Sequence, residues 1–297
     1  MRILALDIGG TAIKSALLNG AGHILKEAET PSEAKQGGAR LMERAKAVID
    51  AYEGFDALGV STTGQVDARA GRIVFANENV PSYTGMQVAD ILRAHAGVPV
   101  AVENDVNAAA LGEASFGAGR GARDFLCLTY GTGVGGAIVI EGRIFGGADG
   151  VAGEIGHILT HPEGLPCACG QRGCYEQYAS VSALMRAARG VCPELQDGRD
   201  LFGRIAARAD LADVVACWVR EVVYGLVSLT HIFNPSLIVL GGGVLSQSAV
   251  LRAIEAQLYP RLMNSYCGVR LASAQLGNQA GVYGAFELAR RVLEGKA

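Results

Sequence analysis

The stretch from Gly153 to Glu176 constrains the fold of this chain more than any other part of its sequence. It carries four side chains of the kinds that bind Zn²⁺ in a tetrahedral site, namely His157, Cys167, Cys169 and Cys174. Gly170 and Gly173 allow the tight backbone turns that bring such cysteines to one ion. Two carboxylates, Glu154 and Glu176, lie among these residues without being needed by the metal. The pattern favours a metal-bound loop that also holds a polar ligand over a plain zinc knuckle or three unconnected thiols.

Length and composition exclude several classes of protein. A chain of 297 residues, 50% of them hydrophobic, is long enough for two lobes with a sizeable core. The net charge of −3 gives no basic footprint for nucleic acid, and no apolar run approaches the roughly 20 residues of a membrane span. The sequence opens on an expected strand, so we expect no signal peptide and a cytoplasmic location. Four further cysteines then suit buried thiols better than disulfides: Cys127, Cys192, Cys217 and Cys267.

Hydrophobic patterning and glycine turns predict a chain of strands and helices. The predicted strands span residues 2–8, 13–18, 23–29, 57–61, 100–103, 125–129, 137–140 and 237–240. The predicted helices span residues 38–52, 106–116, 181–189, 201–209, 211–233, 248–261 and 280–293. A strand–glycine turn–strand unit opens the chain and recurs from residue 125, after the glycine-rich stretch 117–122. This repetition predicts an α/β fold of two related lobes that face each other across a cleft.

Three glycine-rich turns each follow a predicted strand: Gly9-Gly10-Thr11, Gly131-Thr132-Gly133 and Gly241-Gly242-Gly243. Glycine lets backbone N–H groups approach a phosphate closely, and the threonine hydroxyls of the first two turns add further donors. The third turn has no polar side chain and suits a flat purine. None matches the common P-loop or dinucleotide fingerprint. Any one alone is better explained as a plain turn, but the three together indicate a nucleotide site.

Two acids at strand ends carry the expected chemistry. Asp7 precedes the first glycine turn, where it would position Mg²⁺ through water. Asp105 follows another strand, where its carboxylate would accept a proton from a substrate hydroxyl that attacks a phosphoryl group. The alternative for Asp105 is the N-cap of the following helix, and both roles are compatible.

Together the motifs resemble those of the ROK family of sugar kinases (repressor, open reading frame, kinase), over essentially the whole chain. The matching motifs are Asp7-x-Gly-Gly-Thr11, Glu103-Asn-Asp105, Gly131-Thr-Gly133, Ala152-Gly-Glu-Ile-Gly-His157, Cys167-x-Cys-Gly-x-x-Gly-Cys174-x-Glu176, Asn234-Pro235, Gly241-Gly-Gly243 and Ala280-Gly281-x-x-Gly284-Ala285. Each short glycine motif is weak alone, whereas the whole set is highly specific.

The resemblance implies a two-lobed actin-like (ribonuclease H-like) ATPase fold, with mixed sheets flanked by helices. The smaller lobe would comprise residues 1–117 with roughly 280–297, and the larger lobe residues 118–279 with the zinc loop. The implied activity is ATP-dependent phosphorylation of the C6 hydroxyl of a hexose, with Mg²⁺, structural Zn²⁺ and Asp105 as general base. His157 would bind zinc through one nitrogen and a sugar hydroxyl through the other.

The resemblance also implies the remaining site residues. The sugar-binding residues would be Gly64, Asn79, Asn104, Asp105, Glu154, His157 and Glu176. The nucleotide-binding residues would be Asp7, Gly9, Gly10, Thr11, Lys14, Gly131, Thr132, Gly133, Gly241, Gly242 and Gly243. The zinc ligands would be His157, Cys167, Cys169 and Cys174.

Several positions near the expected sugar site depart from the family pattern. Thr62-Thr63-Gly64 replaces a common Pro-Gly turn, Pro166 replaces a glycine, and residues 80–83 lack a frequent tryptophan. The identity of the sugar therefore stays open. Glucose is the first candidate substrate, because Glu154, His157 and Glu176 resemble the sugar-binding residues of ROK glucokinases. N-acetylmannosamine is the second candidate.

Other classes of protein fit less well. A DNA-binding ROK repressor needs a winged-helix module before the first strand, and a sugar-binding protein without catalysis would not need both Asp7 and Asp105. A donor such as polyphosphate in place of ATP stays open. The family implies a homodimer, possibly a dimer of dimers, to which the apolar segment 214–229 could contribute, although this segment fits a core better.

Overall fold

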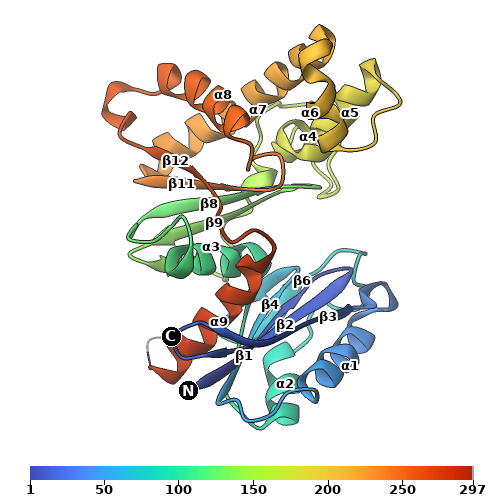
Figure 1. Cartoon of the computed structure of the whole chain (residues 1–297), viewed down its shortest axis with the longest axis vertical. Coiled ribbons are helices and arrows are strands. Elements are labelled where there is room, and N and C mark those ends of the chain that lie inside the picture. The colour runs from blue at the N-terminus through green and yellow to red at the C-terminus, as the bar shows by residue number, and fades with distance from the viewer. Residues whose placement is uncertain (296–297) are drawn as a thin grey trace. The chain divides into compact units, whose positions relative to one another are not determined.

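The computed structural model describes residues 1–295 and divides the chain into two compact units (Figure 1). The first unit comprises residues 1–121, 138–152 and the segment from 275 onward. The second unit comprises residues 122–137 and 153–274. Both ends of the sequence therefore contribute to the first unit.

The first unit is built on a five-stranded sheet whose order is β3 (Ile24–Pro31), β2 (Ala12–Asn19), β1 (Arg2–Ile8), β4 (Ala57–Thr62) and β7 (Val100–Asn104). β1 pairs with β2 in antiparallel register, whereas β1, β4 and β7 run parallel. The carboxyl ends of these three strands consequently lie at one edge of the sheet, which is where open α/β sheets bind ligands.

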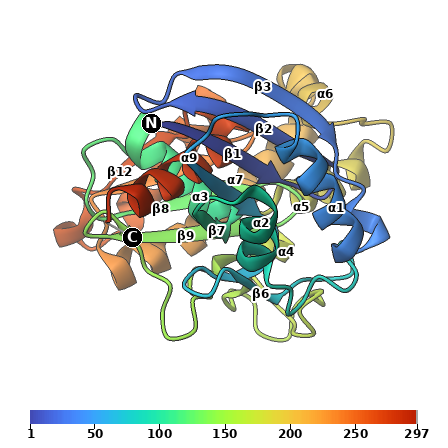
Figure 2. The same cartoon turned by 90° about the horizontal axis from the view of Figure 1, so that it is seen from below.

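Alternation along β1 places helices on both faces of this sheet (Figure 2). Leu4 and Leu6 belong to a buried cluster with α1 (Gly38–Ile49) and α2 (Val88–Ala96), whereas Ile3 and Ala5 pack with α9 (Ala280–Leu293). α9 also packs on α3 (Asp105–Phe116), where a Cβ on Gly284 would overlap the Ala108 carbonyl. A glycine is needed there because the two helix backbones approach so closely.

A buried acid on α3, Glu113, binds the segment of chain that leads into α9. Glu113 Oε1 accepts hydrogen bonds from the N–H groups of Gln275 and Leu276, each at 2.8 Å, and its Oε2 accepts from Ala118 N at 2.7 Å. The side chain is 1% exposed. One carboxylate thus satisfies three backbone donors from two distant parts of the sequence.

The other five-stranded sheet has the order β10 (Arg143–Ile144), β9 (Val134–Ile140), β8 (Phe125–Tyr130), β11 (Leu237–Gly241) and β12 (Arg270–Ser273). β8, β11 and β12 run parallel. The helices of the second unit are α4 (Glu176–Ala179), α5 (Val181–Val191), α6 (Gly198–Arg204), α7 (Ala209–Phe233) and α8 (Ser248–Leu258). Trp218, Val222 and Leu226 on α7 are buried, which confirms the core interpretation of that segment.

Smaller elements connect these layers. A two-stranded hairpin pairs β5 (Gln65–Asp67) with β6 (Arg72–Phe75). Single turns of 3₁₀ helix are η1 (Ala34–Gln36), η2 (Ile155–His157), η3 (Ile205–Ala207), η4 (Tyr259–Arg261), η5 (Asn264–Tyr266) and η6 (Gly277–Gln279).

The predicted elements agree with the observed ones except at ends and in short segments. The helix predicted over 38–52 ends at Ile49, and the one predicted over 201–209 breaks at Arg204 into a 3₁₀ turn. The strand predicted over 137–140 already begins at Val134, within the predicted turn. The β5–β6 hairpin, β10, β12 and α4 escape prediction because each is too short to show a hydrophobic period, and α2 is missed although its nine residues have an apolar face.

All seven cysteines are free thiols. Cys127 and Cys192 are buried as predicted, but Cys217 and Cys267 are exposed, so the prediction of burial is wrong for these two. Cys217 lies on the outer face of α7, because that helix turns the neighbouring Trp218 inward. Cys267 lies in the turn after η5.

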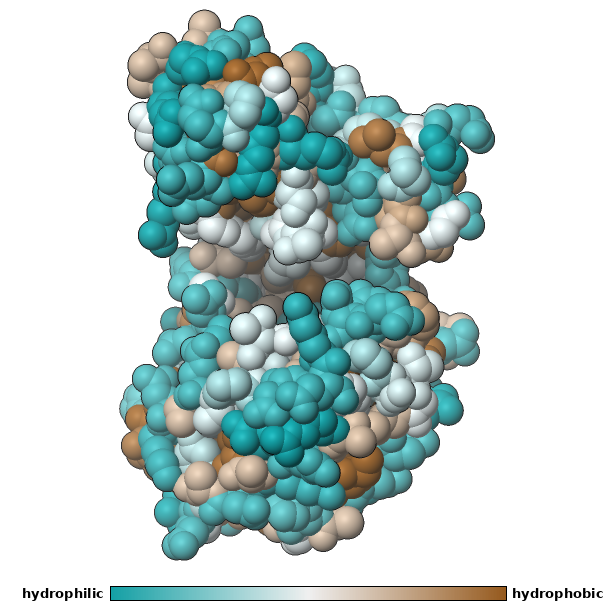
Figure 3. Space-filling model, turned by 90° about the vertical axis from the view of Figure 1, so that its right-hand side faces the viewer, coloured by the Kyte–Doolittle hydropathy of each residue, from teal (hydrophilic) through white to brown (hydrophobic). Residues whose placement is uncertain are grey.

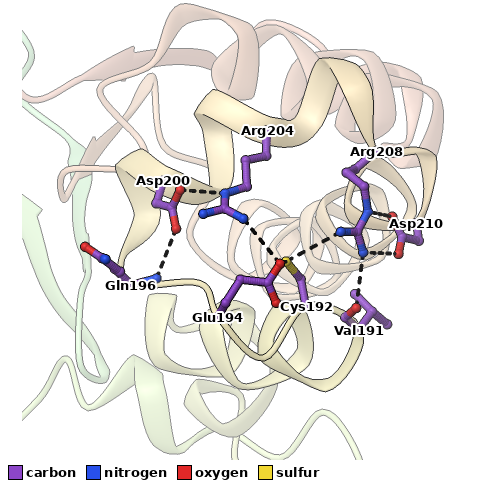
Figure 4. Close-up of polar contacts among 8 residues, drawn as sticks. All are labelled: Val191, Cys192, Glu194, Gln196, Asp200, Arg204, Arg208 and Asp210. Carbon is purple, nitrogen blue, oxygen red and sulfur yellow. Dashed lines mark hydrogen bonds and ion pairs between the residues drawn. The ribbon is translucent and has the colours of Figure 1, made fainter.

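Cys192 ends α5 within a polar cluster that closes the corner between α5, α6 and α7 (Figure 4). Its Sγ donates to Glu194 Oε1 at 3.0 Å and accepts from Arg208 at 3.7 Å. Arg208 forms a bidentate pair with Asp210 at 2.9 and 2.7 Å, and Arg204 Nη1 lies 3.3 Å from Glu194. The side chains of Glu194 and Arg208 therefore hold the Cys192 thiol in place in the segment between α5 and α6.

On the face drawn in Figure 3, each unit carries mainly hydrophilic residues with hydrophobic ones in small separate groups. Within residues 1–295, no helix has the length and apolar character that crossing a membrane requires.

Candidate active site and metal centre

The carboxyl ends of β1, β4 and β7 bring together polar side chains from distant parts of the first unit. Asp7 on β1 stands in register with Ser61 on β4, and Thr62 stands in register with Asn104 on β7. Ser61 Oγ donates to Asp7 Oδ1 at 2.8 Å. Asp105 follows directly as the first residue of α3. The topology thus brings the two predicted acids to one edge of the sheet.

Asp105 has an unusual electrostatic environment for an aspartate that water can reach. Its Oδ1 accepts from Asn104 Nδ2 and from Val106 N, both at 2.9 Å. Desolvation by the surrounding protein and, second, the negative charge of Asp7 raise the pKa of Asp105 to about 6. A carboxyl with such a pKa accepts a proton more readily than an ordinary aspartate while remaining largely ionised at neutral pH.

The helix cap falls on the neighbouring residue. Asn104 Oδ1 accepts from Val106 N at 2.9 Å and Asn107 N at 3.2 Å, so Asn104 is the N-cap of α3 and the alternative cap role of Asp105 is wrong. The Asn104 amide also donates to Gly64 O at 2.9 Å. That turn needs a glycine, because Gly64 has φ +95°. Asn104 therefore ties together the strand end, the helix start and the turn before β5.

Glu103 accepts hydrogen bonds from residues at the start of α3, a role that the sequence does not reveal. Its buried Oε1 accepts from Asn104 N at 2.8 Å and from Asn107 Nδ2 at 3.0 Å. Burial raises the pKa of Glu103, and the bond from Asn107 opposes this effect. The sequence signal for this role of Glu103 is an acidic residue at a strand position that faces the protein interior.

The first glycine turn lies beside Asp7 and Lys14. Gly9 N donates to Ala12 O at 2.9 Å, which closes the turn between β1 and β2. Lys14 is the β2 partner of Asp7, and its Nζ donates to Asn278 O at 3.1 Å. Burial raises the pKa of Asp7, while the bond from Ser61 and the charge of Lys14 lower it.

Asn79, the remaining predicted sugar-binding residue of the first unit, lies in an exposed turn. Its N–H is bonded to Asn77 Oδ1 at 3.0 Å. Tyr83 follows in the same loop and is buried, with its hydroxyl 2.9 Å from Thr62 Oγ1. The loop is therefore anchored to the end of β4 through Tyr83 rather than through Asn79.

The second unit carries the other two glycine turns. Gly131 N donates to Gly133 O at 3.0 Å, and Gly131 O accepts from Val181 N, also at 3.0 Å. The side of Gly131 and of Gly243 where a side chain would project is open space. A Cβ on Gly133 would overlap Glu176 Oε2, so this glycine lets the Glu176 carboxylate lie against the turn.

The four predicted metal ligands meet in the second unit, with their ligand atoms all within 4.8 Å of one another. Cys169 Sγ and Cys174 Sγ are 3.5 Å apart, and Cys167 Sγ is 3.6 Å from His157 Nδ1. Tetrahedral Zn²⁺, with bonds of about 2.3 Å to sulfur and about 2.0 Å to nitrogen, needs ligand separations of roughly 3.5–3.8 Å. The soft donor set and its spacing therefore fit Zn²⁺.

The thiols of this cluster have different environments. Burial raises the pKa of Cys174 to about 12 and also raises that of Cys167, whereas a bond from Gln171 N lowers the pKa of Cys169. A divalent cation would supply the positive charge that stabilises all three thiolates. Cys169 is exposed, so one edge of the cluster is open to solvent.

The two predicted carboxylates lie on either side of this cluster. Glu176 Oε1 accepts from Cys167 Sγ at 3.2 Å. Glu154 Oε2 lies 3.9 Å from His157 Nε2, the ring nitrogen that does not face the cysteines. His157 thus presents one nitrogen to the metal ligands and the other to the Glu154 side.

This architecture is that of a known family, because the ROK family model matches residues 3–292. The chain belongs to the ROK family. A glucokinase from Streptomyces coelicolor is 36% identical over 97% of both chains, and an N-acetylmannosamine kinase from Citrobacter koseri is 30% identical over 98% of this chain and 99% of that protein. A solved ROK family glucokinase from Streptomyces griseus, in complex with glucose and AMPPNP, superposes with a TM-score of 0.84 at 32% identity. The match covers 98% of this chain and 100% of the Streptomyces griseus chain.

These comparisons confirm the fold class that the motifs imply. ROK sugar kinases have the actin-like ATPase fold, and the two mixed α/β sheets with their flanking helices agree with it.

Proposed function

We propose that this protein is an ATP-dependent hexose kinase that phosphorylates the C6 hydroxyl of its sugar, with glucose as the first candidate. The observation that carries the proposal is Asp105, an accessible carboxylate at the start of α3 whose pKa is raised to about 6 beside a second acid, Asp7. Glucokinases that match the chain nearly end to end support the choice of reaction and sugar.

Asp105 acts as the general base. Its carboxylate accepts the proton of the sugar C6 hydroxyl as that oxygen attacks phosphorus. Asn104 donates one amide hydrogen to Asp105 and the other to Gly64 O, so a direct hydrogen bond to the sugar would replace one of these two bonds. The exposed turn that carries Asn79 would contribute a further sugar contact.

MgATP, when bound, supplies the phosphoryl group and the positive charge that offsets its negative oxygens. In the first unit, Gly9 N–H is used to close its own turn, so Gly10 and Thr11 provide the phosphate donors. Gly131 N–H is likewise used, which leaves Thr132 and Gly133 for this role. Asp7 would hold the magnesium ion, with Lys14 as its neighbour on β2, and residues 241–243 would bind the purine.

The second unit holds the sugar hydroxyls with Glu154, His157 and Glu176. The metal cluster fixes His157 through Nδ1 and leaves Nε2 for a sugar hydroxyl. The three thiolates and the imidazole would supply all four ligands of a tetrahedral Zn²⁺, so the ion would have a structural role.

The test is an assay of ADP release with MgATP and a panel of glucose, mannose, fructose, allose, N-acetylglucosamine and N-acetylmannosamine, each with its kcat/KM. We expect the highest kcat/KM for glucose. Repetition with polyphosphate as donor separates the nucleotide from other phosphoryl sources. Absence of phosphorylated product with every sugar and both donors, in folded and zinc-containing protein, would refute the proposal.

N-acetylmannosamine is the second candidate substrate. It is favoured by the Ser61–Gly64 turn, whose last carbonyl oxygen accepts from Asn104, and by the matching N-acetylmannosamine kinase. A preference for this sugar in the panel would assign the 62–64 turn and the 79–83 loop to its acetamido group.

We also propose that the protein is a homodimer, which a measurement of its molar mass in solution tests.

A further inference from the structure

Two buried tyrosines join the metal loop to the second glycine turn. Tyr130 is the last residue of β8, directly before Gly131, and Tyr175 lies between Cys174 and Glu176. Their hydroxyl oxygens are 2.9 Å apart, and their rings meet edge to face with centroids 6.3 Å apart. Both side chains are buried to within 1%. A direct hydrogen bond thus links residues that adjoin two different parts of the site.

The direction of this hydrogen bond follows from its neighbour on α7. Tyr175 donates its hydroxyl hydrogen to Val222 O at 2.7 Å. A hydroxyl has only one hydrogen, so Tyr130 must be the donor to the Tyr175 oxygen. Burial raises the pKa of both phenols well above neutral, which keeps both protons in place. The two tyrosines form a fixed chain of donors that ends on the helix backbone.

Backbone contacts of the same residues extend this connection. Tyr175 N donates to Ile158 O at 2.8 Å, immediately after His157. A Cβ on Gly225 would overlap the Tyr175 ring, so α7 leaves space for this ring by carrying a glycine. A Cβ on Gly242 would overlap the Tyr130 carbonyl oxygen. The loop that carries the metal ligands and α7 therefore contact Tyr175, and the 241–243 turn contacts the backbone of Tyr130.

We propose that Tyr130 and Tyr175 are positioning residues that couple metal binding to nucleotide binding. A metal ion that holds Cys174 restrains the backbone of Tyr175, the hydroxyl bond passes this restraint to Tyr130, and Tyr130 orients the Gly131 turn. This inference rests on the proposed function, in which the glycine turns bind ATP. Coupling between two sites is reciprocal in binding free energy, so nucleotide must also tighten the binding of the metal.

The experiment measures Kd for the magnesium complex of AMPPNP by calorimetry, with zinc-loaded and chelator-treated protein. Tyr130→Phe is the cleanest variant, because Tyr175 keeps its bond to Val222 and no buried donor loses its partner. Tyr52→Phe is the matched control, since Tyr52 is a buried tyrosine of the first unit whose hydroxyl lies 2.9 Å from Ser15 Oγ. Thermal unfolding checks that each protein is folded in both metal states.

We expect zinc removal to weaken nucleotide binding about tenfold in the wild type and in Tyr52→Phe, and to leave it nearly unchanged in Tyr130→Phe. Nucleotide should likewise lower the Kd for zinc about tenfold, measured by competition with a chelator at equilibrium, but not in Tyr130→Phe. A wild-type Kd that does not depend on zinc overturns the coupling alone, as does an undiminished zinc effect in Tyr130→Phe. Wild-type protein that binds no nucleotide in either state overturns the proposed function as well.

Discussion

Gly281, near the start of α9, faces the carboxylate of Asp7: a Cβ at position 281 would lie 2.5 Å from Asp7 Oδ1. Residues from opposite ends of the sequence therefore pack against each other, and the absence of a side chain at 281 leaves the room that the Asp7 carboxylate occupies.

Substitution Gly281→Ala should displace Asp7 and lower kcat, while KM for the sugar changes little. The reason is that the added methyl group would occupy the position of the Asp7 carboxylate, and we propose that this carboxylate binds the magnesium ion. A tenfold or greater loss of kcat and a higher Mg²⁺ requirement are expected. Gly190→Ala is the control, because Gly190 is a helical glycine with open space around it. Equal activity of both variants would mean that Asp7 has no role in catalysis.

The pH dependence of kcat/KM should report the Asp105 carboxyl. Its pKa of about 6 means that the base is ionised above that pH and becomes protonated below it. The rate should thus be constant near pH 8 and fall about tenfold for each unit below pH 6. A profile that stays flat down to pH 5, measured with a stable folded enzyme, is the contrary result.

Removal of the same carboxylate tests its role directly. Asp105→Asn keeps the size of the side chain but cannot accept the proton, so kcat should fall by about 10²–10⁴ with little change in sugar affinity. Asp90→Asn on α2 is the control, since Asp90 only pairs with Arg93 on the surface. Near-normal turnover of Asp105→Asn would remove this residue from the base role.

Loss of a cysteine ligand should release the metal. In Cys174→Ser the weaker oxygen donor should leave substoichiometric zinc, a lower Tm and weaker sugar binding together, because the loop carries His157 and Glu176. Cys267→Ser removes an exposed thiol outside the cluster and should retain one zinc per chain. Metal analysis and calorimetry give the two readouts. A Cys174→Ser protein with full sugar affinity and no zinc would contradict the assigned metal centre.

Glu113 should be one of the most costly residues to truncate in the first unit. Glu113→Ala leaves three partly buried N–H groups without their charged acceptor, which should lower the free energy of unfolding by roughly 2–5 kcal/mol. Glu43→Ala removes an exposed acid from α1 and should cost less than about 0.5 kcal/mol. Denaturant titration compares the two. Similar midpoints would mean that water replaces the carboxylate.

Local sequence predicts those parts of the site that are set by neighbouring residues. The strand ends at Asp7 and Asn104 follow from short buried runs, and the cysteine spacing predicts a cluster that closes within one loop. The cap of α3 could not be assigned, because Asn104 and Asp105 are both good caps and boundaries shift by a residue. Asn104 takes that role, which leaves Asp105 free to face solvent.

Contacts between distant residues escaped prediction for a different reason. Tyr130 and Tyr175 both read as ordinary core aromatics, and nothing local says that their hydroxyls meet. Glu113 likewise gives no sign that its partners are Gln275 and Leu276. Such pairs depend on how strands and helices are arranged in space, whereas the two exposed cysteines depend on which face of an element points outward.

The packing of α9 on β1 has a consequence for the order in which the chain acquires its structure during synthesis. Ile3 and Ala5 emerge from the ribosome first, yet the Phe286 and Ala289 side chains that cover them emerge among the last. All of residues 122–274 that form the second unit are translated in between. The second unit can therefore fold while one face of the earlier sheet is still bare, and that bare apolar face is where a nascent chain would need a chaperone.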